Sequence, residues 1–147
     1  YGLARGPIAE YTGRDARSVF AGPELAGKLN AIWEQHVPNT PVPLVASDRW
    51  FGGNIALNLH RNTQVFISAD YFKSPWLDPE TALNCGALVV YAPEAKGYWS
   101  PKLIALYQKA SIKGEFEQHW SRSGRSPSFI VQWGIITPGP QCGQAKN

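Results

Sequence analysis

Val45-Ala-Ser-Asp-Arg-Trp-Phe-Gly-Gly-Asn54 is the stretch that decides the predicted fold, because an apolar run ends there and a short amphipathic helix begins. Pro43-Leu-Val-Ala46 is apolar enough for a buried strand, and Ser47 or Asp48 can cap the helix that follows. From about Asp48 to His60, the apolar residues Phe51, Ile55 and Leu59 recur every four positions. Ligands of open α/β sheets bind where a strand end feeds a helix N-terminus. This junction is therefore the first candidate for a functional site.

Two adjacent glycines, Gly52 and Gly53, lie inside this predicted helix. Each costs roughly 1 kcal/mol relative to alanine in a helix interior, so the pair needs a compensating reason. Two reasons are open: close packing against a neighbouring element, which we favour, and close approach of a partner.

Strands and helices alternate along the chain, which is typical of a parallel sheet with helices on its faces. We predict strands at 44–47, 64–68 and 87–91. Three further helices are predicted, each with a proline in the first turn. One starts near Gly22 and ends before Pro38, and the next runs from Asp78 to about Asn84. The last starts near Ser100 and ends at Gly114. Alternating residues at 115–120 and 129–135 predict an antiparallel hairpin around the loop 121–127. The predicted fold class is α/β: a three-layer, Rossmann-like mixed sheet, mostly parallel, with a C-terminal antiparallel hairpin.

The 147 residues suit a single domain, since a chain of this length buries roughly 68 to 70% of its unfolded surface. We expect a lead-in or tether at 1–21 with a short strand near 17–20, one α/β domain at 22–138, and a flexible tail at 139–147. The sequence contains no methionine, so we expect a processed product or a piece of a longer protein. Its apolar runs are far shorter than the roughly 20 residues that span a bilayer, and no signal peptide heads it.

Charge and cysteine content limit the classes of partner. The net charge of +3 is small and the basic residues are scattered, so we expect no nucleic-acid partner. Cys85 and Cys142 form a candidate disulfide, because an even number of cysteines can pair in an oxidising compartment.

The sequence lacks the usual catalytic motifs. It contains no Gly-x-Ser-x-Gly nucleophile elbow, no P-loop and no dinucleotide glycine fingerprint. The three histidines and two cysteines are far apart and show no zinc-ligand spacing. We therefore assign no catalytic residue, no cofactor and no metal.

Polar and aromatic residues follow the first two predicted strands. If these strands are parallel neighbours, both groups lie at one edge of the sheet. Tryptophan faces, carboxylates and an amide can bind a sugar, by stacking on its ring and by hydrogen bonds to its hydroxyls. The competing interpretation, which we favour, is that the tryptophans anchor the core and the acids cap helices. The candidate ligand-binding residues are Asp48, Arg49, Trp50, Asn54, Asp70, Lys73, Trp76 and Asp78.

Several of these motifs, in this order and spacing, resemble the C-terminal soluble domain of bacterial family 39 type membrane glycosyltransferases, which are related to protein mannosyltransferases and aminoarabinose transferases. The resemblance covers about residues 20 to 137 and has no catalytic signature. It is carried by Phe20-Ala-Gly-Pro-Glu-Leu-Ala, Trp33, Pro43-Leu-Val-Ala-Ser-Asp-Arg-Trp-Phe-Gly-Gly-Asn-Ile-Ala56, Asp70-Tyr-Phe-Lys-Ser-Pro-Trp-Leu-Asp78 and Gly86-Ala-Leu-Val-Val-Tyr91.

The resemblance implies a multi-span enzyme that moves a sugar from a polyprenyl-phosphate donor to an acceptor on the outer side of the bacterial inner membrane. This chain would be its periplasmic domain, and its partner would be the membrane-embedded part of the same protein, which carries the catalytic acid. The domain would cover the membrane active site, help to position a glycan or lipid-linked acceptor, or stabilise the assembly.

Two other functions stay open. One is a freestanding periplasmic glycan-binding module that uses Trp50 and Trp76. The other is a small hydrolase that uses Asp48 and Asp70 as an acid and base pair, which requires their carboxyl groups to lie within about 10 Å of each other.

Overall fold

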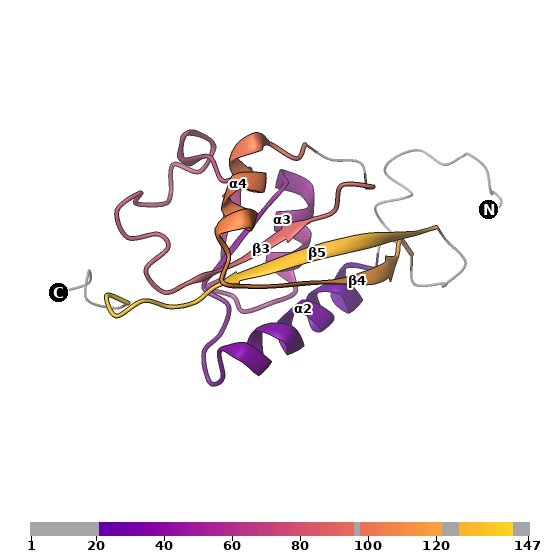
Figure 1. Ribbon diagram of the computed structural model, residues 1–147, viewed down its shortest axis with the longest axis horizontal. Coiled ribbons are helices and arrows are strands. Elements are labelled where there is room, and N and C mark those ends of the chain that lie inside the picture. The colour runs from indigo at the N-terminus through magenta and orange to yellow at the C-terminus, as the bar shows by residue number, and fades with distance from the viewer. Residues whose placement is uncertain (1–20, 96–97, 122–126, 143–147) are drawn as a thin grey trace.

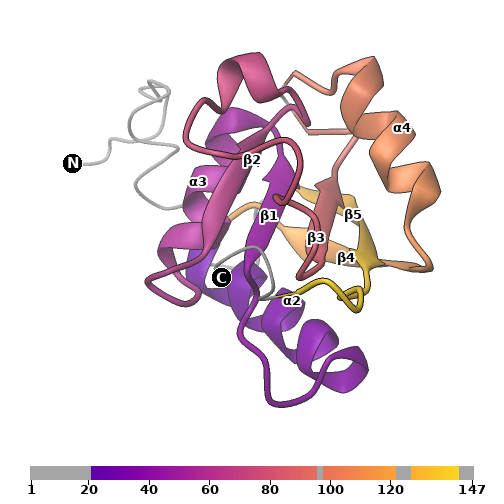
Figure 2. The ribbon, with the colours of Figure 1, turned by 90° about the vertical axis from the view of Figure 1, so that its left-hand side faces the viewer.

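The structure is a computed structural model, and it describes residues 21–95, 98–121 and 127–142. Three helices cover both faces of a five-stranded sheet: α2 (Gly22–His36) and α3 (Arg49–Leu57) lie on one face, and α4 (Pro101–Lys109) lies on the other (Figures 1 and 2). The strands are β1 (Leu44–Ser47), β2 (Gln64–Ile67), β3 (Ala87–Tyr91), β4 (Ile112–His119) and β5 (Ser128–Ile136). The predicted strand near 17–20 lies outside the described residues.

The predicted fold class is wrong. The strand order is β2-β1-β3-β5-β4, and in the described part of the chain two of the four strand pairs are parallel and two are antiparallel. The sheet is therefore mixed, and it is not a mostly parallel Rossmann-like sheet. The reason is the position of β5, which inserts between β3 and β4 and runs antiparallel to both. The predicted antiparallel pairing of the last two strands is correct.

The second predicted helix does not form. Residues 79–85 make a series of turns, and the connection from β2 to β3 carries only the short 3-10 helix η1 (Tyr71–Lys73). Asp78 accepts a hydrogen bond from the N–H of Glu80, and its carbonyl accepts from the N–H groups of Thr81 and Ala82. Separate turns follow this one, and the last of them ends at Gly86, which has a φ of 91°. A cap and a proline start a turn in this segment, but too few residues follow to continue it as a helix.

The other helices form where they were predicted; α2 ends before Pro38 as expected, whereas α3 and α4 end earlier than predicted. Proline lies in the first turn of α2 and of α4, and Ser100 Oγ accepts a hydrogen bond from the N–H of Leu103 at 3.1 Å. The α3 helix ends at Leu57 instead of His60, because the N–H of Asn58 bonds to the carbonyl of Ile55 in a tighter turn. Gly114 does not end a helix, since it lies inside β4, where a Cβ atom would overlap the indole of Trp133.

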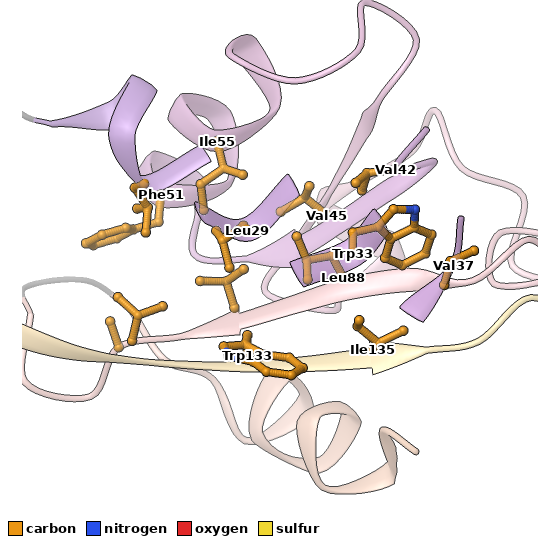
Figure 3. Close-up of a cluster of buried hydrophobic side chains, with 14 of the residues drawn as sticks. Leu29, Trp33, Val37, Val42, Val45, Phe51, Ile55, Leu88, Trp133 and Ile135 are labelled. Atoms are coloured by element: carbon orange, nitrogen blue, oxygen red, sulfur yellow. The ribbon is translucent and has the colours of Figure 1, made fainter. Parts of the chain in front are cut away.

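The larger part of the core lies between the sheet and the pair α2 and α3. Figure 3 shows Leu29 and Trp33 of α2 and Phe51 and Ile55 of α3 packed over Val45, Leu88, Trp133 and Ile135 of the strands. A smaller cluster around Leu103 packs α4 on the other face. The inner strand β1 is buried along its whole length, whereas the edge strand β4 alternates between half-buried and exposed residues, except for the buried Gln118. These two layers of side chains hold the carboxyl ends of β1, β2 and β3 in fixed positions.

Candidate functional site

Asp48 fastens the junction between β1 and α3. One carboxylate oxygen accepts hydrogen bonds from the backbone N–H groups of Trp50 (3.1 Å) and Phe51 (3.5 Å). The other oxygen accepts one from the N–H of Tyr98 (2.9 Å), in the loop after β3. Asp48 is only 7% exposed, so these three donors compensate a nearly buried charge. Both oxygens hold backbone segments together, which favours the capping interpretation of Asp48 over an acid–base role with Asp70.

Serine side chains tie the carboxyl ends of the three parallel-paired strands to one another. Ser47 Oγ donates to the carbonyl of Val90 (3.0 Å), and Ser100 Oγ donates to the carbonyl of Ser68 (2.7 Å). The N–H of Ser68 donates to the carbonyl of Ser47 at 2.8 Å. Ser68 and Ala69 have φ values of 55° and 54°, which non-glycine residues rarely adopt. The serine hydrogen bonds therefore hold a strained turn at the end of β2.

Charged and aromatic side chains gather beside this turn. Asp70 accepts a hydrogen bond from the N–H of Phe72 (2.9 Å), and its carboxylate lies 3.6 Å from Lys102 Nζ. Lys73 Nζ lies 4.6 Å from the centre of the Tyr98 ring, which is a cation–π distance. Three predicted site residues thus come together at one edge of the sheet, as expected for parallel neighbours. We call this edge the carboxyl-end corner; it consists of Asp48, Ser68, Asp70, Lys73, Tyr98, Ser100 and Lys102.

Three other predicted site residues lie together on the outward face of α3, around an open hollow of about 340 Å³. Trp50 forms one side, and its ring stacks on Trp120 with centres 5.4 Å apart. Leu57 is 82% exposed and adds apolar surface at the end of α3. We call this surface the α3 hollow; it is lined by Arg49, Trp50, Gly53, Asn54 and Leu57.

The two glycines of α3 have different surroundings. A Cβ atom on Gly52 would lie 2.9 Å from Val65 Cγ1 and 3.6 Å from Ser47 Cβ, so close packing of α3 on β1 and β2 explains this glycine. A Cβ atom on Gly53 would meet no described residue within 4 Å. Packing therefore accounts for Gly52 alone, and at Gly53 the second reason, close approach of a partner, is still open.

Trp76 has different neighbours from Trp50. Its indole Nε1 donates to the carbonyl of Val65 at 2.8 Å, and Ser74 Oγ accepts from the N–H of Ile67 at 2.9 Å. The segment after η1 thus folds back over the outer edge of β2. Trp76 is nevertheless 50% exposed, so its ring is accessible from solvent.

Asp78 lies on the same connection and is exposed. Its carboxylate accepts a hydrogen bond from the N–H of Glu80 at 3.0 Å. Burial raises the pKa of Tyr71, and the negative charge of Asp78 raises it further. Asp78 therefore stabilises a turn and contributes to the raised pKa of Tyr71, which packs against the smaller core cluster.

Cys85 and Cys142 are joined by a disulfide, with Cα atoms 4.5 Å apart. Next to it, the N–H of Gly139 donates to the carbonyl of Asn84 at 2.8 Å. The chain after β5 is thus fastened beside the segment that leads into β3. Disulfides persist in oxidising compartments such as the periplasm.

Some residues of these surfaces were not predicted. Leu57 could have been found, because it is an apolar residue outside the stripe formed by Phe51 and Ile55. Phe72, which is 93% exposed, is likewise an apolar residue in a polar segment. Tyr98 and Lys102 carry no such signal, since only the path of the chain after β3 brings them to the corner.

Within residues 21–95, 98–121 and 127–142, no three His, Cys, Asp or Glu side chains are grouped so that they could hold a metal ion. Over the same ranges, no helix is both long and apolar enough to cross a bilayer. Comparison with protein-family models, with curated proteins and with solved structures gave no match.

Proposed function

We propose that this chain is an extracytoplasmic accessory domain of an integral-membrane glycosyltransferase that transfers a sugar from a polyprenyl-phosphate donor. In this proposal the membrane-embedded part of the same protein carries out the chemistry, on the periplasmic side of the bacterial inner membrane. The domain covers that active site or helps to position the acceptor.

The observation that carries the proposal is the α3 hollow. Its half-buried tryptophan and its arginine are of types enriched in protein interfaces. Gly53 costs roughly 1 kcal/mol in the helix, and no described residue packs where its side chain would be, so the described part of the fold gives no reason for a glycine there. A glycine on a helix surface lets another backbone approach closely, as at contacts between membrane helices. We therefore place the contact with the membrane-embedded part at this surface.

Two further features support the proposal. The disulfide between Cys85 and Cys142 fits an oxidising compartment. Both carboxylate oxygens of Asp48 accept hydrogen bonds from backbone N–H groups, so this carboxylate has a structural role. That role agrees with a reaction that takes place in another part of the protein.

The test uses the full-length protein in membranes and a polyprenyl-phosphate sugar donor. A Cβ atom at Gly53 meets no described residue within 4 Å, so the leucine of Gly53→Leu should extend into the α3 hollow and the domain should fold normally. Sugar transfer should fall about tenfold, which corresponds to a loss of about 1.4 kcal/mol in docking free energy. Ala105→Leu, at an exposed position of α4 on the opposite face, is the matched control and should keep full activity.

Two results would contradict the proposal. One is an unchanged transfer rate in Gly53→Leu membranes. The other is a gene whose coding region upstream of Tyr1 lacks apolar segments of roughly 20 residues, because the enzyme would then have no membrane-spanning part there.

The alternative, a freestanding glycan-binding module, is favoured by one observation, the half-exposed ring of Trp76. Titration calorimetry of the isolated chain with lipid A sugars and peptidoglycan fragments tests it. Heat that disappears in Trp76→Ala would support a module of this kind, and no heat with any of these ligands would exclude it.

A further inference from the structure

A second hollow lies at the opposite end of the sheet from the carboxyl-end corner. It has a volume of about 490 Å³ and is formed by the outward face of α2, the loop before β1 and the residues that follow α3. These segments precede β1 and β2, so the hollow lies near the amino ends of both strands. We call it the α2 hollow and define it by Gly27, Asn30, Glu34, Asn39, Asn58 and His60.

The α2 hollow presents many hydrogen-bonding groups and little charge. Three carboxamides line it, and each has both donor and acceptor atoms. His60 Nδ1 accepts a hydrogen bond from the N–H of Asn62 at 3.1 Å, so in the neutral ring the proton is on Nε2, which becomes a donor. Glu34 adds acceptors, and none of the described residues that line the hollow is a lysine or arginine. This combination suits a neutral ligand with several hydroxyl groups and disfavours an anion.

The wall of the hollow also contains apolar surface. Pro23, Pro41 and Leu59 contribute carbon atoms beside the polar groups. A sugar ring has an apolar face of C–H groups and a rim of hydroxyls, so it matches a wall that mixes carbon atoms and amides. The volume falls within the roughly 300–1,000 Å³ of small-molecule sites.

Gly27 provides an independent observation. It lies inside α2 and is exposed, and a Cβ atom on it would meet nothing within 4 Å among residues 21–95, 98–121 and 127–142. Glycine is less favourable than alanine in a helix interior, and no contact with these residues requires it here. A glycine is expected where a ligand approaches the backbone closely.

We propose that the α2 hollow binds a neutral saccharide unit. The carboxamides of Asn30 and Asn58, the Nε2–H of His60 and the carboxylate of Glu34 bond to its hydroxyls, and its ring lies over Gly27. The proposal does not rest on the docking role of the α3 hollow, because the two surfaces share no residue.

The test is an NMR titration of the isolated chain with glucose, mannose, N-acetylglucosamine and maltose, with glucuronic acid as the anionic arm. At least one neutral sugar should cause saturable shifts at the backbone amides of Gly27, Asn30 and Asn58. Glucuronic acid should bind about tenfold more weakly than the tightest-binding neutral sugar, because its carboxylate faces that of Glu34.

Gly27→Leu should weaken the binding about tenfold or more, because its side chain occupies the space meant for the ring. Gly53→Leu is the matched control, since it makes the same change in the other hollow, and it should leave the affinity unchanged. The proposal is overturned if none of the four neutral sugars causes saturable shifts, if Gly27→Leu binds like the wild type, or if glucuronic acid binds as tightly as the tightest-binding neutral sugar. None of these results depends on sugar transfer by the full-length protein, so this proposal and the proposed function can fail separately.

Discussion

Alanine at Gly53 should stabilise the domain, whereas alanine at Gly52 should leave it unchanged or destabilise it, although the two positions are neighbours in α3. At Gly53 the new Cβ atom meets nothing, so the free energy of unfolding should rise by roughly 1 kcal/mol from helix propensity alone. At Gly52 the same atom would lie 2.9 Å from Val65 Cγ1, and something must shift. Overpacking of this kind typically costs about 1–3 kcal/mol, which cancels or exceeds the gain in propensity.

The two variants should therefore differ by about 1–3 kcal/mol, with Gly52→Ala the less stable. Urea unfolding followed by tryptophan fluorescence measures this difference, and the melting temperature of Gly53→Ala should rise by about 3 °C for a domain of this size. Val65→Ala removes the clashing methyl group, so it should destabilise the Gly52→Ala protein less than it destabilises the wild type.

Equal stabilisation by alanine at both positions would refute the close contact between α3 and β2. A destabilised Gly53→Ala protein would refute the conclusion that the space over Gly53 is open, and it would also remove the main support for a docking surface there.

Three further predictions concern stability. Asp48→Ala should lower the free energy of unfolding by about 2–4 kcal/mol, because a helix loses its cap and the N–H of Tyr98 loses its acceptor; a loss below about 0.5 kcal/mol in urea unfolding would contradict this. Loss of the bond between Cys85 and Cys142, 57 residues apart, should cost about 2–4 kcal/mol, and intact mass after alkylation without reductant should show no free thiol. Burial, with a smaller contribution from Glu115, raises the pKa of Tyr107 above 10.0, so this tyrosine's contribution to stability should be complete below pH 10 and should be lost as the pH rises through its folded-state pKa. Urea unfolding across alkaline pH should show this loss, and Tyr107→Phe should reduce it.

Local features of the fold were predictable because they depend on neighbouring residues. The cap at Asp48, the proline in the first turn of α2 and the apolar runs of β1 and β3 all act within a few positions, and the structure has these elements where they were expected. The order of the strands was not predictable in the same way. The alternating residues of β5 indicate a strand, but they do not say that it inserts beside β3.

The candidate site was predictable to a similar extent. Two strands that are parallel neighbours bring Asp48 and Asp70 to one edge, and that inference needs only the pattern of strands and polar residues. The stripe of Phe51 and Ile55 places Gly52 beside the buried face of α3 and Gly53 on the opposite face, but the close contact of Gly52 with Val65 depends on how α3 packs on β2. Tyr98 reaches the carboxyl-end corner through a loop whose path no local pattern determines.

The way the chain covers β2 has a consequence for behaviour at high concentration. An edge strand exposes unpaired N–H and C=O groups, and these can add a strand from another molecule and start aggregation. Here the indole N–H of Trp76 donates to the carbonyl of Val65, and Ser74 Oγ accepts from the N–H of Ile67. The outer edge of β2 therefore has fewer free groups for a second chain, so a Trp76→Ala protein should be more prone to self-association even if its sugar binding is unchanged. In this prediction Trp76 protects the solubility of the domain by pairing one outward-facing carbonyl of a four-residue strand.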